Sequence, residues 1–174
     1  MTTERDDLLQ HLCTHRELFL VTVRDLSDET ARSRPTVSEL SLGGLVKHVA
    51  AVEKTWADFV VAGPAEQPDV DWAGIDWNDP PMEVVEYQNG FRLLEHETLE
   101  GVLGEYAAVS AATDALVRTV DLDARHPLPE APWFEPGASW SNRMAFLHIA
   151  AETAQHAGHA DILRETIDGQ KTMG

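Results

Sequence analysis

Residues 148–161 read HIAAETAQHAGHAD, an alanine-rich stretch that carries three histidines and one glutamate. Alanine is the strongest helix former, so the stretch is expected to be helical. Each residue of a helix advances by ~100°, so His148, Glu152 and His156 span an arc of about 80°. His159 falls inside the same arc. The four polar side chains therefore share one face of the expected helix.

The same face carries apolar side chains, whereas the charged residues of this helix lie elsewhere. Apolar residues that share or border the arc are Ala145, Ile149 and Leu163. Residues expected on the opposite, outer side are Arg143, Asp161, Arg164 and Glu165. A helix in a globular protein turns its apolar face toward the core. The histidines and the glutamate are therefore predicted to point into the protein.

A second helix shows the same combination of apolar stripe and histidine. Its stripe repeats at steps of three and four and contains Leu45, Val49, Val52, Trp56 and Phe59. His48 lies within this stripe. The charged residues expected on other faces are Lys47, Glu53, Lys54 and Asp58. This helix is expected to begin at the N-cap Ser41. Gly43 and Gly44, in its first turn, would permit the close approach of a neighbouring helix or a ligand.

A metal ion would satisfy the inward-facing groups of both helices at once. A buried carboxylate is costly unless it is paired or bound to a metal. Two ligands one turn apart on one helix, with a third from a facing helix, are a known way to build a metal site in a bundle. His48, Glu152 and His156 form such a set. The alternative is that the histidines are hydrogen-bonded side chains packed in an ordinary core.

Around these two helices the chain reads as an all-α, four-helix bundle in one domain, residues 1–174. The helical regions cover residues 4–26, 41–63, 82–120 and from 139 or 141 to 167, with irregularities expected near Gly90 and near Gly101 or Gly104. Gly169 is the expected stop of the last helix. The loops after the second and third helices are long, and the first holds Trp72 and Trp77. That loop is either a lid or a crossover whose tryptophans plug one end of the bundle.

The amino-acid composition excludes several classes of partner and an internal disulfide. The 174 residues include 30 acidic and 13 basic ones, for a net charge of −17. This balance argues against nucleic acid and anionic membrane surfaces as partners. The single cysteine, Cys13, excludes an internal disulfide. Neither a signal peptide nor a membrane-spanning run is recognisable, so a cytoplasmic location is expected.

Two segments resemble the DinB superfamily of four-helix metalloproteins. They are SLGGLVKHVAAVEKTW (residues 41–56) and HIAAETAQHAGHADILRETIDG (residues 148–169). A glutamate at position 152, where the superfamily usually has histidine, is shared with the N-terminal domain of mycothiol-dependent maleylpyruvate isomerase. The isomerase carries a further C-terminal domain and this sequence ends at Gly174, so maleylpyruvate isomerisation itself is not expected.

The resemblance implies that His48, Glu152 and His156 bind a divalent metal, usually Zn²⁺ but in some relatives Ni²⁺ or Fe²⁺. It further implies a thiol S-transferase that activates a low-molecular-weight thiol such as mycothiol for attack on a small-molecule electrophile. His159 is the expected fourth ligand or proton carrier, and His148 lies one turn from Glu152. The alternatives are a metal-dependent hydrolase and a non-catalytic metal-binding bundle that forms a homodimer through its outer faces.

Aromatic residues and one arginine complete the expected site. The residues that could wall its mouth are Trp56, Trp133, Phe134 and Trp140, although each is more often a core residue. Arg143, on the outer face, is a weak candidate for binding a substrate carboxylate.

Overall fold

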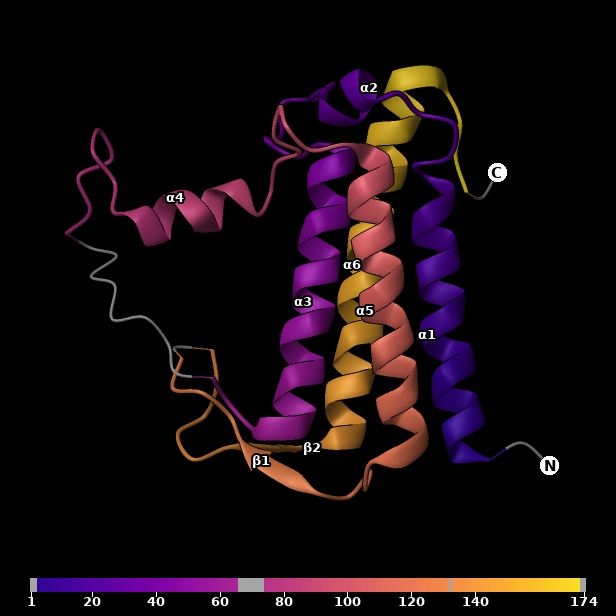
Figure 1. Cartoon of the computed structure of the whole chain (residues 1–174), viewed down its shortest axis with the longest axis vertical. Helices are drawn as coiled ribbons and strands as arrows, with labels where there is room; N and C mark the ends of the chain where they lie inside the picture. The colour runs from indigo at the N-terminus through magenta and orange to yellow at the C-terminus, as the bar shows by residue number, and fades with distance from the viewer. Residues whose placement is uncertain (1–2, 66–73, 132, 173–174) are drawn as a thin grey trace.

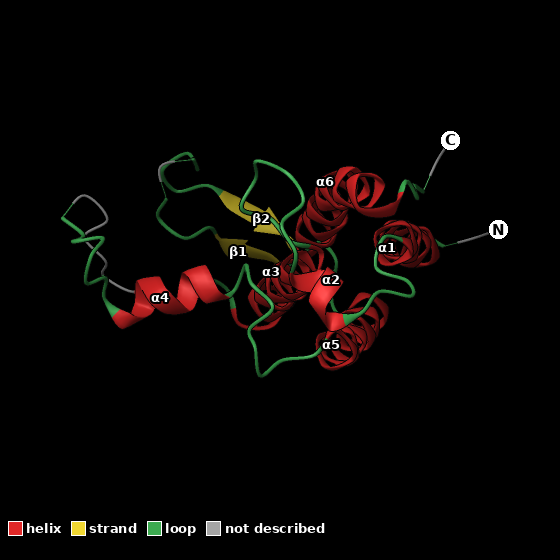
Figure 2. Cartoon of the chain, turned by 90° about the horizontal axis from the view of Figure 1, so that it is seen from above, coloured by secondary structure: helices red, strands yellow, loops and turns green. Residues whose placement is uncertain are grey.

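Four long helices lie side by side in the computed structural model, which describes residues 3–65, 74–131 and 133–172 (Figure 1). In chain order the elements are α1 (Glu4–Val21), α2 (Asp28–Arg32), α3 (Leu42–Ala62), α4 (Met82–Asn89), α5 (Leu99–Thr119), β1 (Arg125–Pro127), β2 (Ser139–Ser141) and α6 (Asn142–Asp168). Seen from above, α1, α3, α5 and α6 surround a common centre (Figure 2). The predicted all-α fold is confirmed.

Side-chain caps fix the ends of the two helices that carry the candidate site. The Ser41 hydroxyl accepts a hydrogen bond from the backbone N–H of Gly44 at the start of α3, and Ser141 accepts one from Met144 at the start of α6. Gly169 ends α6 in the left-handed conformation, with φ of 80°, which glycine adopts without strain. The predicted beginnings of both helices and the stop at Gly169 are confirmed.

The third helical region differs from its prediction. Instead of one region over residues 82–120, the chain forms α4, a turn over residues 90–98, and α5. The irregularity near Gly90 is confirmed, but Gly101 and Gly104 lie inside α5, which the Thr98 hydroxyl caps. Helix α4 projects sideways from the bundle, with its C-terminal end nearer α3 and its N-terminal end farther from it (Figure 1).

Short elements account for the other differences. Helix α1 ends at Val21 rather than at residue 26, because a turn precedes the small helix α2, which Ser27 caps. Strands β1 and β2 pair antiparallel, with His126 opposite Trp140, in the segment predicted to be a loop. Strands of three residues are too short to show an alternating pattern.

Two charged residues expected on outer faces are buried. Glu53 is fully buried, and Arg16 of α1 places Nη2 2.5 Å from its Oε1 and Nη1 2.8 Å from Oδ1 of Asp114 on α5. Arg164 is also buried and donates hydrogen bonds to the backbone carbonyls of Thr22 and Arg24. Hydrophobic periodicity does not reveal such residues, because their burial depends on ion pairs and hydrogen bonds to distant segments.

The apolar core divides into two clusters along the bundle. One contains Phe19 and Leu45, and the other contains Phe59 and Ile149. On each long helix a buried polar residue stands between the positions that belong to the two clusters; these residues are Arg16, Glu53, Thr113 and Thr153. A polar layer therefore crosses the middle of the bundle. Among the described residues no helix could span a membrane.

Candidate metal centre

His48 of α3 meets Glu152 and His156 of α6 inside the bundle. One nitrogen from each histidine and one carboxylate oxygen of Glu152 all lie within 4.8 Å of one another, and the three residues are half-buried. Helices α3 and α6 pack directly against each other, which brings the two sequence segments together. The structure thus places side by side the three residues predicted as metal ligands.

Packing holds the ring of His48 in place. The Phe91 ring stacks on it, with centroids 4.5 Å apart and planes 24° apart, and the His156 ring meets it edge-on at 4.6 Å. Phe91 lies in the turn after α4, whose backbone packs against Gly44. A Cβ atom at Gly44 would lie 2.7 Å from the carbonyl carbon of Phe91, so glycine permits this approach. A turn therefore approaches Gly44, rather than the neighbouring helix or ligand that was expected there.

Lys47 fixes the same turn from the adjacent position of α3. Its ammonium donates hydrogen bonds to the carbonyls of Asn89 and Arg92, both at 3.0 Å, and lies 2.8 Å from Oε1 of Glu97. The ammonium therefore binds three points of the segment that carries Phe91. Adjacent residues of α3 thus provide the candidate ligand and the anchor of the ring that stacks on it.

Burial keeps the imidazoles of the site uncharged. It lowers the pKa of His48 from its ordinary value of 6.5 to about 4, and the neighbouring His156 adds to the shift. Burial also lowers the pKa of His148 and of His156, with the Glu152 carboxylate opposing the shift in both. The neutral imidazole is the form that binds a metal, because its ring nitrogen keeps a lone pair.

His156 makes its two polar contacts through different ring nitrogens. Nε2 lies 3.8 Å from Oε2 of Glu152, whereas Nδ1 lies 3.4 Å from Nδ1 of His159. His148 lies on the other side of Glu152, with its Nε2 3.6 Å from Oε1. His159 is exposed. The predicted face of α6 is therefore continuous in space, with the ligand candidates at its centre and His148 and His159 at its two ends.

Aromatic rings surround His148. Trp56 and Trp140 stack on each other with centroids 4.8 Å apart, and each meets the His148 ring edge-on. Phe134 packs on Trp140, while Trp133 is 78% exposed and contacts Phe134. Of the four aromatic residues expected at the mouth, Trp56 and Trp140 lie nearest the candidate ligands.

Two other expectations concern residues farther from the ligands. The guanidinium of Arg143 is bound by the carboxylates of Glu4 and Asp123, so it is already occupied by the protein's own acidic groups. Trp77 is largely exposed. Trp72, expected in a lid or plug, lies outside the described residues.

Sequence reasoning missed one wall of the site. A pocket of about 350 Å³ opens beside His48, and we call it the α3–α4 pocket; its walls include Val52, Trp56, Glu86, Tyr87 and Phe91. No spacing rule connects α4 to α3, because the turn at residues 90–98 brings them together. The only signal in the sequence was the pair Gly43 and Gly44, which indicated that something approaches α3 closely.

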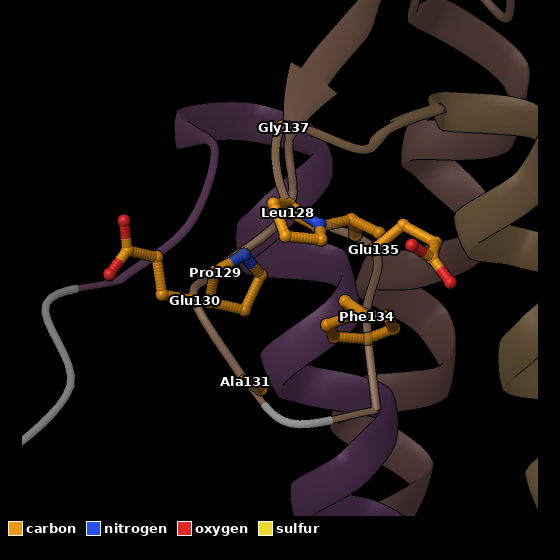
Figure 3. A pocket seen from close by; sticks show the side chains of 8 residues that line it. Leu128, Pro129, Glu130, Ala131, Phe134, Glu135 and Gly137 are labelled. Carbon is orange, nitrogen blue, oxygen red and sulfur yellow. The ribbon is translucent and has the colours of Figure 1, made fainter.

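Another pocket, of about 520 Å³, lies within the loop between β1 and β2 (Figure 3). It is lined by Pro129, Glu130, Phe134 and Glu135, among others. The Glu130 and Glu135 side chains extend in opposite directions (Figure 3). Ring contacts run from Phe134 through Trp140 to His148, so this pocket adjoins the aromatic side of the candidate centre.

Comparison with known proteins gives the family of the chain and similar folds. The model of a family described as mycothiol-S-transferase matches residues 7–169. A conserved protein from Enterococcus faecalis is similar in structure, with a TM-score of 0.65 and 16% identity, over 98% of this chain and 100% of its own. A protein from Streptococcus pneumoniae is also similar in structure, with a TM-score of 0.63 and 14% identity, over 96% of this chain and 93% of its own. Likeness at these identities shows the fold alone. No curated protein matches the chain.

Proposed function

The chain belongs to the mycothiol-S-transferase family, and from this premise we propose that it is a metal-dependent thiol S-transferase. In this proposal His48, Glu152 and His156 hold a divalent metal, of which Zn²⁺ is the first choice. The observation that carries the proposal is the convergence of two imidazole nitrogens and one carboxylate oxygen within 4.8 Å. Such a donor set suits Zn²⁺, and three protein ligands are typical of catalytic rather than structural zinc sites.

The residues fit a metal in their charge as well as their type. The burial that lowers the pKa of His48 to about 4 leaves its imidazole neutral at physiological pH. The half-buried Glu152 has imidazoles on both sides and no Lys or Arg partner among the described ion pairs. A divalent ion would supply the missing positive charge, and a bound thiol would then lose its proton at neutral pH.

The other residues of the site position the ligands and handle the proton. Stacking by Phe91 holds the His48 ring. His159 contacts the nitrogen of His156 that faces away from Glu152, and such a partner orients a ligating ring. Because His159 is exposed, we propose that it also passes the proton lost by the thiol to solvent. The thiolate sulfur would then attack the electrophilic carbon, and the leaving group would depart with the electron pair of its bond to that carbon.

The test measures metal content and thiol transfer on the same preparation. Purified protein is expected to contain about one metal ion per chain and to speed the reaction of mycothiol with monobromobimane. Chelation should abolish the rate and Zn²⁺ should restore it. His156→Ala should lose both metal and activity, whereas His11→Ala, at an exposed site on α1, should keep both.

Each of the remaining outcomes contradicts the proposal in its own way. Metal-dependent turnover of ester or amide substrates without any thiol would identify a hydrolase. Bound metal without turnover of any electrophile, with mycothiol or with comparator thiols such as glutathione and cysteine, would identify a metal-binding bundle. If freshly purified protein contained no metal, the histidines would instead be side chains packed in an ordinary core.

A further inference from the structure

The α3–α4 pocket adjoins the candidate metal centre, with which it shares His48. His48 forms part of its wall, and Trp56, Tyr87 and Phe91 give it three aromatic side chains. Phe91 also stacks on His48, and Tyr87 packs edge-on against Phe91 at 5.2 Å. Rings in such a wall favour flat, apolar or aromatic ligands through stacking and edge contacts.

The charge around this pocket is one-sided. Glu86 carries the one carboxyl group in its described lining. No lysine or arginine contributes to the described lining, and Arg92, next to Phe91 in the chain, is exposed outside it.

The nearest cations on α3 are occupied. The Lys47 ammonium is held by Glu97 and by two carbonyls, and Lys54 lies 2.5 Å from the carboxylate of Asp58 on the outer side of the helix. The chain as a whole carries a net charge of −17. A bound carboxylate would therefore face Glu86 with no lysine or arginine in the described lining to offset the repulsion. The positive charge of the proposed divalent ion would be offset by Glu152 and the bound thiolate. Glu86 is exposed, so solvent partly screens the repulsion.

We propose that the α3–α4 pocket binds the electrophile, and that it accepts aromatic electrophiles that are uncharged or cationic and rejects anionic ones. The inference rests on the proposed transferase function, and it adds the class of the second substrate. The aromatic walls attract an uncharged ring, and together with Glu86 they also favour a cation. Aromatic carboxylates, by contrast, lack any basic partner in the described lining.

Three benzylic bromides of similar size test this charge preference. They are 4-(bromomethyl)benzamide, 4-(bromomethyl)benzoate and 4-(bromomethyl)phenyltrimethylammonium. In each reaction the mycothiol sulfur forms a bond to the benzylic carbon, the carbon–bromine bond breaks, and bromide leaves with the electron pair. The thiol proton passes to the buffer. Each kcat/KM is divided by the rate constant of the same reaction without protein, which removes differences in intrinsic reactivity.

The metal-loaded protein should prefer the benzamide to the benzoate by about tenfold, which corresponds to ~1.4 kcal/mol. The trimethylammonium compound should react at least as well as the benzamide. Glu86→Lys should remove the discrimination against the benzoate. Glu83→Lys makes the same change of charge one turn earlier on the same helix, at a residue outside the described lining, and should preserve the discrimination.

Failure of this inference is distinguishable from failure of the proposed function. Mycothiol-dependent turnover with an equal or greater preference for the benzoate would overturn the inference and leave the transferase standing. If none of the three benzylic bromides reacts, the proposed transferase function is wrong, and the binding of unreactive analogues tests the charge preference of the pocket instead. Nuclear magnetic resonance titration should then show that 4-methylbenzamide perturbs the Trp56 indole more strongly than 4-methylbenzoate does; the reverse order would overturn it.

Discussion

At the scale of single residues, burial makes the histidines of the candidate centre sensitive to acid. In the unfolded chain His48 takes up a proton near its ordinary pKa of 6.5, but in the folded protein only near pH 4. Between these values the unfolded state binds more protons, so the free energy of unfolding falls as the pH is lowered. His148 and His156 have lowered pKa values and act in the same direction.

We therefore expect the urea midpoint of the metal-free protein to fall between pH 7 and pH 5. Circular dichroism at a series of pH values measures it. In His48→Phe the fall should be smaller, because the residue with the pKa near 4 is gone. His11→Ala, which alters an exposed histidine, should show the full fall. An equal fall in His48→Phe and in the unaltered protein would contradict this account.

Some residues of the site could be placed from the sequence, and others could not. Helical spacing places Glu152 and His156 on one face, and the stripe of α3 supplies His48, so their meeting follows from local periodicity and bundle packing. Their role as metal ligands stays a prediction. Glu53 and Arg164 could not be placed in this way, since each is buried through partners on other segments.

At the scale of elements, the contact between α3 and the turn after α4 depends on the missing side chain of Gly44. A Cβ atom there would meet the Phe91 backbone, which cannot rotate out of the way. Gly44→Ala is therefore expected to lower the free energy of unfolding by about 2 kcal/mol. Because Phe91 stacks on His48, the substitution should also weaken metal binding. Urea denaturation and competition with a zinc chelator measure the two effects.

Gly104 offers a matched control within a helix. It lies inside α5, and a Cβ atom there would meet nothing within 4 Å. Gly104→Ala should raise the free energy of unfolding by about 0.5–1 kcal/mol, because alanine is the better helix former. If Gly44→Ala were as stable as Gly104→Ala, the turn would not be held against α3.

The ends of elements were predictable where a capping residue marks them. Ser41, Ser141 and Gly169 each carry the chemistry of a cap, and each stands at the helix end expected of it. Helix α2 and the two strands are too short for periodicity to reveal. Lys47 of α3 binds the last residue of α4 and the start of the turn after it, and the sequence does not display these contacts.

At the scale of the whole molecule, the polar layer joins helices that are distant in sequence. Arg16 of α1 binds Glu53 of α3 and Asp114 of α5. Removing one partner leaves the other charge buried and unpaired, so Arg16→Met is expected to cost about 3–5 kcal/mol of unfolding free energy. The double variant Arg16→Met with Glu53→Met should recover most of this loss, because it removes both charges. Urea denaturation measures both.

An exposed ion pair provides the comparison. Lys54→Met breaks the contact with Asp58 on the surface of α3 and should cost less than about 1 kcal/mol. A double variant as unstable as Arg16→Met alone would mean that the layer acts through shape rather than charge.

For the whole molecule, the fold class and the order of the long helices along the chain were predicted correctly. Four long amphipathic helices and two long connections define a bundle, and the described residues confirm it. A single domain over residues 1–174 stays a prediction. The thiol and the electrophile also stay predictions, because hydrophobic periodicity carries no information about which small molecules bind.

The three contacts that Lys47 makes with residues 89–97 limit how the length of this segment can change among members of the family. The carbonyls of Asn89 and Arg92 and the carboxylate of Glu97 must keep their spacing to meet one ammonium. An insertion or deletion between residues 89 and 97 would break this hold and carry Phe91 away from His48. Length changes upstream of α4 leave these contacts in place. We therefore expect evolution to have varied the chain length before α4 and to have conserved it after.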